Sequence, residues 1–477
     1  MPLKLFVVSS QLTPHGTRLP LGETLGELIA PLGERDVQIE VVLPLHSDID
    51  PDKYGLARRL TKLEIDVAGE RADCTLYEGR WGPRQARLWF IGHPESFDRE
   101  TPHARHEDDP ARFYLLAKAA LQLAQQSESA PNVLLASGWQ TGFVPIFARK
   151  EAFFSASKIV FSLDDPQELG LFDAAALDQL HIGYDHFSPE GIEFHGQASL
   201  LKAGVLFADK VILPSVSAVE DLQQERHGAG LHGLYAAHAK KLVGILGGMD
   251  SKQWDPARDH RLTAFYSAED LSGKDTCKAA LQRELDLQRR PTTALLALLG
   301  PFSETSQLEH LAAVEKEWLN RKLQLAFIGE AGPEQAAIIE RLKNARPDAI
   351  AHVNATASEE LLHRVLAGAD GLLIPDRSQA TGLDLLKALR YGAIPVGHAA
   401  GAAHDVMVDF DVVSRTGNAF TADDTPASLL AAVDRFLATY ESKERWRALQ
   451  RSILGSPFSW EMTAERWGSV LDSLVTK

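Results

Sequence analysis

The regular alternation of short apolar runs with amphipathic helical patterns constrains the fold of this chain more than any other feature. Apolar runs bounded by polar or turn residues predict buried strands, and residues 111–126 carry the apolar stripe of a helix. Strands that alternate with helices predict a parallel sheet. In the first half of the chain we predict strands at 5–8, 39–43, 88–91, 133–136, 159–163 and 211–213.

The second half of the chain repeats this alternation and predicts a second α/β domain. Because 477 residues exceed what one hydrophobic core usually serves, two domains are expected. We predict an N-terminal domain at 1–250, a C-terminal domain at 251–458 and a final helix at 459–477 that returns to the first domain. The predicted elements of the second half are strands at 294–299, 323–328, 371–374 and 394–396 and helices at 359–367 and 383–390.

Composition and charge exclude several classes of protein. With 45% hydrophobic and 24% charged residues and no long apolar run, the sequence is typical of a soluble globular protein. The first residues predict a strand and not a signal peptide, so a cytoplasmic location is expected. Only Cys74 and Cys277 are present, which excludes a disulfide framework and a cysteine-based zinc site. The net charge of -16 disfavours nucleic acid and anionic membranes as partners.

Three groups of motifs resemble those of bacterial glycogen and starch synthases, and they lie at matching intervals along the chain. The first group contains Phe-His-Gly-Gln-Ala-Ser-Leu-Leu-Lys-Ala-Gly at 194–204, and the second begins with Tyr-Ser-Ala-Glu-Asp-Leu at 266–271. The third contains Ala-Leu-Arg-Tyr-Gly-Ala-Ile-Pro-Val at 388–396. Further segments of these groups are 208–211, 244–250, 254–257, 278–282, 367–370, 382–383 and 458–460.

The resemblance implies a GT-B architecture, in which two doubly wound Rossmann-like domains face a cleft and the C-terminal helix crosses back to the first domain. The family transfers glucose from ADP-glucose to a glucan end with retention of configuration and without a metal. An acceptor-side N-terminal domain and a donor-side C-terminal domain are therefore expected. The implied partners are an α-glucan such as glycogen and enzymes of glycogen metabolism. No metal or other cofactor is expected, and ADP-glucose or ADP is the expected ligand.

The loop after the strand at 294–299 departs from the family pattern at its two cations. In the family, an arginine and a lysine of this loop stabilise the departing diphosphate. In this chain Pro301 and Ser306 stand at those positions, and Glu304 adds negative charge. Proline has no side-chain donor, so the loop is predicted to disfavour a diphosphate.

Other positions of the family site are also substituted. Gln379 replaces the acidic residue that binds the transferred glucose, Gln140 replaces a histidine, and Asp164 replaces a neutral or cationic group beside the diphosphate. The glycine-rich N-terminal loop is replaced by Thr-Arg-Leu-Pro-Leu-Gly-Glu at 17–23, where Leu19 and Pro20 bring side chains to positions that need bare backbone. No residue is therefore assigned a catalytic role.

Residual binding of a donor or phosphate remains open. The helix that begins near Thr381 presents backbone N–H groups that favour an anion, with Arg377 nearby, although the same helix start also serves simply as a cap. The candidate donor or phosphate-binding residues are Arg18, Gly22, Arg377, Gln379, Thr381, Gly382 and Leu383.

For two further groups of residues we favour a structural interpretation over a functional one. The spacing of His103, His106, Asp108 and Asp109 suits a metal, but a solvated polar loop is the preferred reading. Tryptophans can stack on sugar rings, but large aromatic side chains more often pack in a core. The tryptophans considered are Trp81, Trp89, Trp139 and Trp254.

Three functions fit these observations. The first is a catalytically inactive or severely impaired member of the family, a pseudoenzyme that binds glucan or a partner in glycogen metabolism. The second is an active retaining glucosyltransferase, using ADP-glucose or another nucleotide sugar, whose cations come from Arg18, Arg377 or Lys202. The third is a carbohydrate-binding or assembly protein with a closed cleft, in which Leu19, Pro20 and Pro301 fill the donor space.

Overall fold

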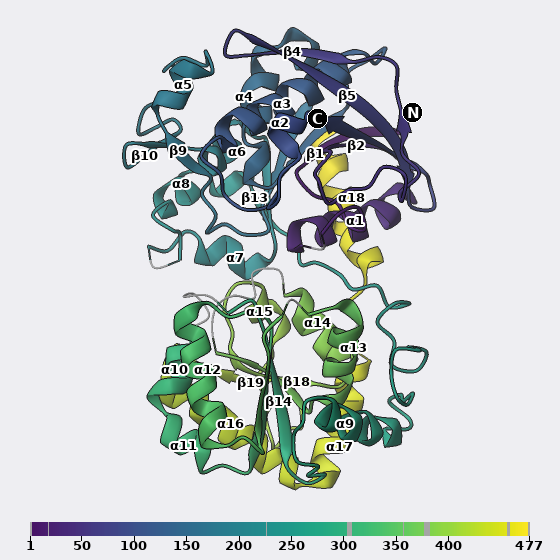
Figure 1. Cartoon of the computed structure of the whole chain (residues 1–477), viewed down its shortest axis with the longest axis vertical. Coiled ribbons are helices and arrows are strands. Elements are labelled where there is room, and N and C mark those ends of the chain that lie inside the picture. The colour runs from purple at the N-terminus through teal and green to yellow at the C-terminus, as the bar shows by residue number, and fades with distance from the viewer. Residues whose placement is uncertain are drawn as a thin grey trace. The chain divides into compact units, whose positions relative to one another are not determined.

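The computed structural model describes residues 2–17, 19–225, 227–302, 308–355, 357–375, 382–455 and 458–475. The chain divides into two compact units (Figure 1). Unit 1 comprises Met1–Leu246 and Trp460–Lys477, and unit 2 comprises Gly247–Ser459. The last helix of the chain thus belongs to the same unit as the first strands.

Unit 1 is built on a ten-stranded sheet with the order β13-β12-β8-β7-β1-β2-β6-β5-β3, in which β4 pairs with β5 off this path. The strands from β13 to β6 are parallel, while β5 is antiparallel to its neighbours. Every residue of β7 is buried, as expected for a strand covered on both faces. The strands are β1 (Leu3–Ser9), β2 (Val37–Pro44), β3 (Ala57–Arg58), β4 (Leu63–Val67), β5 (Glu70–Trp81), β6 (Ala86–Gly92), β7 (Val133–Ser137), β8 (Lys158–Ser162), β12 (Lys210–Leu213) and β13 (Leu242–Gly244).

Helices cover this sheet, and the C-terminal helix α18 (Trp460–Val475) packs on α1 (Pro20–Gly33). Its buried face contains Trp467 and Leu471. A small sheet of β9 (Leu171–Asp173), β10 (Glu193–Phe194) and β11 (Gln197–Ser199) completes the unit. The other helices are α2 (Pro94–Phe97), α3 (Asp109–Gln125), α4 (Phe143–Lys150), α5 (Ala175–Gln179), α6 (Leu200–Phe207), α7 (Val216–Asp221) and α8 (His232–Ala237), with short 3-10 turns η1 (Trp139–Thr141), η2 (Ala152–Phe154) and η3 (Ala239–Lys241).

Unit 2 is a six-stranded parallel sheet with the order β16-β15-β14-β17-β18-β19. Its strands are β14 (Ala294–Leu299), β15 (Leu323–Ile328), β16 (Ile350–Val353), β17 (Gly371–Ile374), β18 (Ile394–His398) and β19 (Phe420–Ala422). Helices α10 and α12 lie on one side of this sheet, and α13 and α14 lie on the other (Figure 1). The helices are α9 (Ser272–Glu284), α10 (Leu308–Ala313), α11 (Glu315–Leu319), α12 (Pro333–Ala345), α13 (Glu359–Gly368), α14 (Leu383–Arg390), α15 (Ala402–Val406), α16 (Pro426–Glu441) and α17 (Lys443–Leu454).

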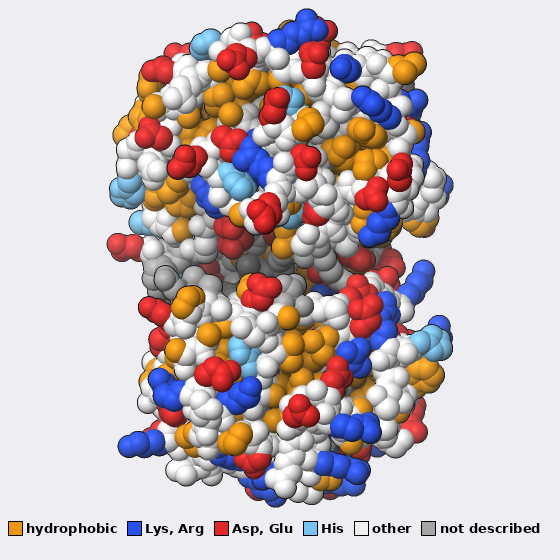
Figure 2. Space-filling view, in the orientation of Figure 1, with side chains coloured by type: hydrophobic (Ala, Val, Ile, Leu, Met, Phe, Trp, Pro, Cys, Tyr) orange, Lys and Arg blue, Asp and Glu red, His pale blue; other side chains and the backbone are white. Residues whose placement is uncertain are grey.

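The strands and helices predicted from apolar patterning are confirmed in both halves of the chain. The patterning missed the hairpin of β4 and β5, whose strands are partly exposed, and the short strands β3, β9, β10, β11, β13, β16 and β19. Acidic and basic side chains are interspersed on the visible face of both units (Figure 2). None of the helices in the described part of the chain combines the length and apolar character that a membrane span needs.

Candidate functional site

Four adjacent parallel strands of unit 1, in the order β8-β7-β1-β2, end at one edge of the sheet. The last residues of three of them, Ser9, Ser137 and Ser162, are neighbours in register, and Ser162 Oγ donates a hydrogen bond of 3.1 Å to Ser137 Oγ. The segments that follow these strands therefore lie side by side. In open α/β sheets, ligands bind at this carboxyl edge.

Gln140 and Asp164 lie at this edge, after β7 and β8 respectively. Gly138 directs the chain into η1 with a φ of 82°, and a Cβ there would lie only 2.7 Å from Gln140 Oε1. Gln140 Oε1 and Asp164 Oδ2 are both buried and accept no hydrogen bond within the described residues. Burial raises the pKa of Asp164 to about 7; the nearby Thr24 hydroxyl opposes this shift, and the charge of Asp165 adds to it. Asp164 is thus partly protonated near neutral pH.

The segments after β1 and β2 add more buried polar atoms to this edge. Ser10 Oγ and Gln11 Oε1 follow β1, and Asp48 Oδ1 follows β2; within the part of the chain that the structure covers, none of the three has a hydrogen-bond partner. An unsatisfied buried polar group costs about 1–3 kcal/mol. We call these five residues the unit 1 polar edge: Ser10, Gln11, Asp48, Gln140 and Asp164.

His103 and the backbone of Thr17 hold the carboxylate of Asp48 in place within the polar edge. Asp48 Oδ2 lies 3.0 Å from His103 Nε2 and accepts a hydrogen bond of 2.6 Å from the Thr17 N–H. Desolvation raises the pKa of Asp48, but the hydrogen bonds from His103 and Thr17 outweigh it and hold that pKa below its usual value. Burial lowers the pKa of His46, which packs against His103 at 4.8 Å between ring centroids, to about 4. His46 is therefore neutral at physiological pH.

Several side chains of the segment 103–109 form hydrogen bonds or ion pairs with other residues. His103 binds Asp48, Arg99 binds Asp108, and the buried Asp109 accepts a hydrogen bond of 2.8 Å from Arg112. The segment is a largely exposed loop up to Asp108, as predicted, while Asp109 is buried at the start of α3. Over the described ranges, no group of three or more histidine, cysteine or carboxylate residues is placed to hold a metal.

Gly22 lies on α1, where the helix packs closely on the backbone after β1. A Cβ on Gly22 would lie 3.2 Å from Gln11 Cβ, and one on Gly26 would lie 2.2 Å from the Thr13 carbonyl oxygen. The Thr13 N–H also donates to the Gly22 carbonyl at 3.0 Å. These contacts explain Gly22 by packing, and a role in donor binding stays a prediction. Arg18 lies outside the described residues.

Lys202, one of the cations considered as a replacement, is engaged by the protein itself. Its side chain is buried on α6, and Nζ donates to the carbonyl oxygens of Pro189 at 2.5 Å and Glu193 at 2.7 Å. These bonds fix the segment 189–193 against the helix. These hydrogen bonds therefore compete with any binding of a diphosphate by the Lys202 ammonium group.

In unit 2, the segment after β14 continues beside the segment after β15. The Gly300 N–H donates to the Ile328 carbonyl at 2.8 Å, and the Phe302 N–H donates to the Glu330 carbonyl at 2.7 Å. Pro301, between them, has no N–H, and the buried Phe302 ring packs on Phe327. The backbone donors at the start of this loop are thus used within the protein. Ser306 lies outside the described residues.

Packing also explains the residues at the start of α14. Gly382 has a φ of 68°, and a Cβ there would lie 3.2 Å from Ala402 Cβ, so the left-handed backbone and the close contact both favour glycine. Leu383 is buried as the first residue of the helix. A phosphate-binding role for Gly382 and Leu383 stays a prediction. Three other candidates of this segment, Arg377, Gln379 and Thr381, lie outside the described residues.

Two of the tryptophans are core residues. The Trp139 side chain is buried, and its Nε1 donates to Glu168 Oε2 at 2.7 Å. The ring of Trp254 stacks on that of His363 with centroids 3.8 Å apart. His363 Nδ1 in turn lies 2.7 Å from Asp259 Oδ2, a buried pair 104 residues apart in sequence that sequence patterning did not reveal.

Comparison with known proteins gives matches along nearly the whole chain. The family model "Starch synthase catalytic domain" matches residues 4–237, and "Glycosyl transferases group 1" matches residues 295–452. A glycogen synthase of Anaeromyxobacter sp. (strain Fw109-5) is 36% identical over 99% of this chain and 100% of that protein. A glycogen synthase of Moorella thermoacetica is 30% identical over 100% of this chain and 98% of that protein.

Solved structures also resemble the chain. The catalytic domain of Starch Synthase IV from Arabidopsis thaliana bound to ADP and acarbose matches with a TM-score of 0.88 and 23% identity, over 100% of both chains. A sucrose-phosphate synthase from Thermosynechococcus elongatus matches with a TM-score of 0.62 and 15% identity, over 99% of both chains.

Proposed function

The chain belongs to the glycogen and starch synthase family of GT-B glycosyltransferases. From this premise we propose that it binds an α-glucan on unit 1. We further propose that it transfers glucose from a nucleotide sugar very slowly or not at all. The proposal has two parts, a retained glucan site and an impaired donor site. The binding part rests on the unit 1 polar edge, and the donor part rests on the loop after β14 together with Asp164.

The unit 1 polar edge carries the binding part of the proposal. Its five buried polar atoms, which lack hydrogen-bond partners among the described residues, follow four adjacent parallel strands. Most of them are acceptor oxygens, and a glucan presents many hydroxyl donors. A glucan hydroxyl at this edge would satisfy groups that otherwise cost free energy.

The start of the loop after β14 supports the impaired donor part. Pro301 stands where the family has an arginine, and the neighbouring N–H groups of Gly300 and Phe302 already bind carbonyls of the protein. Loss of one preorganised donor to a developing anion typically slows a reaction by about 10² to 10³. Asp164 adds a partly charged carboxyl group where the family has a neutral or cationic residue.

An active glucosyltransferase is the second candidate. It is favoured by the relatives, because proteins called glycogen synthase align with 99% to 100% of this chain. The structural neighbour described as bound to ADP suggests ADP-glucose as the donor. In this case Arg18 and Arg377 are the cations expected to bind the diphosphate, since Lys202 is engaged elsewhere.

One set of measurements on the full chain separates these functions. Calorimetry measures ADP-glucose binding, transfer of radiolabelled glucose to glycogen measures activity, and an affinity gel measures glycogen retention. Retention without donor binding or transfer supports the proposal. Transfer that Arg18→Ala or Arg377→Ala abolishes, while the exposed control Arg283→Ala preserves it, overturns the proposal in favour of the active enzyme. Neither retention nor transfer favours an assembly protein with a closed cleft.

A further inference from the structure

The end of the unit 1 sheet that carries β3 is an exposed edge. Among the described strands β3 pairs only with β5, which separates it from β6 and the rest of the sheet. Both residues of β3 are exposed, and every residue from there to the start of β4 is exposed as well, so the whole segment 57–62 faces solvent. We call this segment, Ala-Arg-Arg-Leu-Thr-Lys, the basic edge.

Main-chain groups of the basic edge are open to pairing with another strand. Arg58 pairs with Tyr77 in antiparallel register, and the Arg59 N–H donates to the Leu76 carbonyl at 2.8 Å. Successive residues of an antiparallel strand alternate between main-chain groups that face the neighbouring strand and groups that face away from it. Since Arg59 bonds to β5, the N–H and C=O of Arg58 point to the open side. Such groups on a sheet edge can bind an added strand.

The basic edge is positively charged, although the whole chain has a net charge of -16. It contains three cations and no carboxylate. Arg59 binds the buried Glu78, whereas the side chains of Arg58 and Lys62 form no hydrogen bond or ion pair with any described residue. Like charges on two copies of this edge would repel one another, which disfavours pairing with a second copy of the chain. The two free cations favour a negatively charged partner.

A groove of about 450 Å³ with an apolar floor lies beside the basic edge. Its lining includes residues 59–61 of the basic edge, the buried Leu76 and Leu123, and the half-buried Trp89. Leu60, at this groove, is fully exposed, with a relative accessible area of 104%. An apolar side chain of a partner would cover these groups and remove their apolar surface from water.

The polar groups of this groove fit a peptide better than a sugar. The Trp89 Nε1 already donates to Glu40 Oε2 at 3.1 Å, and the Arg87 guanidinium lies 5.6 Å from the centre of the Trp89 ring. Arg87 in turn lies 3.3 Å from a carboxylate oxygen of Glu78. The charged groups around the ring are thus matched to one another. A neutral sugar polymer would also gain nothing from the two free cations of the basic edge.

We propose that the basic edge and its groove bind an extended acidic segment of a partner protein. The segment adds a strand beside Arg58, places carboxylates on Arg58 and Lys62, and inserts an apolar side chain beside Leu60. In strand addition, main-chain hydrogen bonds supply affinity, and contacts of alternate side chains supply specificity. In the described part of the chain, the groove lining and the unit 1 polar edge share no residue, so this interaction does not depend on glucan binding or glucosyl transfer.

Selection from a phage-displayed library of random linear peptides, with the full chain as the target, tests the proposal. We expect enriched peptides in which acidic residues alternate with apolar ones. Fluorescence anisotropy then measures the affinity of a selected peptide, which we expect Arg58→Glu/Lys62→Glu to weaken at least tenfold and Leu60→Ser to weaken about fivefold. The matched control Arg84→Glu/Lys150→Glu reverses two other exposed cations of unit 1 and is expected to leave the affinity unchanged. Added salt should weaken the interaction, because exposed charges are screened.

Three outcomes overturn the proposal. The first is a selection that enriches no peptide, or only peptides without an excess of carboxylates. The second is equal weakening in both double variants, which excludes recognition by the basic edge. The third is displacement of the peptide by glycogen together with reduced glycogen retention in Trp89→Ala, which assigns the groove to a glucan. An unchanged unfolding transition in each variant ensures that the comparison reports on binding and not on stability.

Discussion

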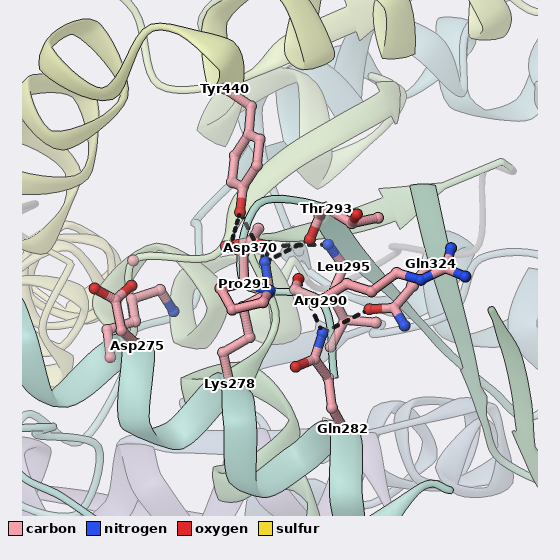
Figure 3. Close-up of polar contacts among 12 residues, drawn as sticks. Asp275, Lys278, Gln282, Arg290, Pro291, Thr293, Leu295, Gln324, Asp370 and Tyr440 are labelled. Carbon is pink, nitrogen blue, oxygen red and sulfur yellow. Dashed lines mark hydrogen bonds and ion pairs between the residues drawn. The ribbon is translucent and has the colours of Figure 1, made fainter. Parts of the chain in front are cut away.

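Several buried polar groups of unit 2 bind one another, whereas each residue of the unit 1 polar edge has a buried side-chain oxygen that lacks a partner among the described residues. In unit 2, Lys278 makes three short contacts (Figure 3), and His363 lies between Asp259 and Tyr391 at 2.7 and 2.8 Å. In unit 1, Gln140 and the other members of the polar edge each have a buried side-chain oxygen that forms no hydrogen bond with a described residue. Both regions lie on parallel α/β sheets, so the fold itself does not cause the difference.

This difference separates polar groups that hold a fold from those that serve a ligand. A satisfied buried network specifies one arrangement of the elements that it joins, and breaking it costs stability. An unsatisfied group lowers stability and is retained where something else satisfies it. Substitutions in the two regions should therefore have opposite consequences for stability and for binding.

The largest effect is expected for Lys278→Ala in unit 2. Lys278 Nζ lies 2.5 Å from Asp370 Oδ2. This change leaves Asp370 buried without its cation, and we expect a loss of about 3–5 kcal/mol in the free energy of unfolding. Guanidinium unfolding measures the loss, with the exposed Lys252→Ala as the control. A loss below about 1 kcal/mol would show that the pair is not essential and would weaken the contrast between the units.

A pH-dependent effect is expected for Asp164→Asn in unit 1. The pKa of Asp164 is about 7 in the folded chain and 3.8 ordinarily, so between these values only the folded state keeps the proton. This group therefore contributes stability below pH 4 that is lost as the pH rises to 7. We expect the variant to be more stable than the parent by about 4 kcal/mol at pH 8 and nearly equally stable near pH 4.

Unfolding curves at several pH values test this prediction. Asp52→Asn serves as the control, because Asp52 is an exposed aspartate of unit 1 and does not contribute to the raised pKa of Asp164. A difference between parent and Asp164→Asn that does not change with pH contradicts the raised pKa.

The same substitution at two glutamines sharpens the comparison. In unit 2, Gln324 is fully buried, accepts from Gln282 and donates to the Gln288 carbonyl at 2.8 Å. Gln324→Leu removes both bonds and is expected to lower the free energy of unfolding by about 1–2 kcal/mol without affecting glycogen retention. Chemical unfolding and the affinity gel measure the two quantities. Stability equal to that of the parent would show that this network contributes little.

Gln140→Leu is expected to give the smallest change in stability. It removes a buried oxygen without a described partner, so the free energy of unfolding should stay within about 1 kcal/mol of the parent. Glycogen affinity should fall by about fivefold, which corresponds to about one lost hydrogen bond. Affinity electrophoresis in gels with graded glycogen gives this ratio. Retention equal to that of the parent, or a large loss of stability, would remove Gln140 from the polar edge.

Much of the fold follows from local sequence. Apolar runs such as 133–136 and 294–299 are buried strands because both faces of a parallel sheet are covered. The motif groups at 194–204 and 388–396 point to the family that the comparisons confirm. Local patterning failed for the β4 and β5 hairpin, because partly exposed strands lack a continuous apolar run.

The polar groups of the site depend on contacts that the sequence does not display. Lys278 meets Asp370 and Tyr440 across 92 and 162 residues, and only the folded sheet brings them together. Motif spacing placed Gln140 and Asp164 at the site, but their unpartnered oxygens and the raised pKa of Asp164 follow from burial. Motif spacing alone assigned Gly22 to donor binding. Its close contact with Gln11 depends on the path of α1, which the sequence does not show.

The position of α18 has a consequence for biosynthesis. Its residues Trp467 and Leu471 are buried in unit 1, and the helix packs on α1, yet it follows unit 2 in the chain. All of unit 2 is therefore synthesised before the first unit receives its final helix. The nascent chain must therefore carry α1 with part of its surface uncovered until unit 2 has been made, so the N-terminal half cannot complete its packing before then.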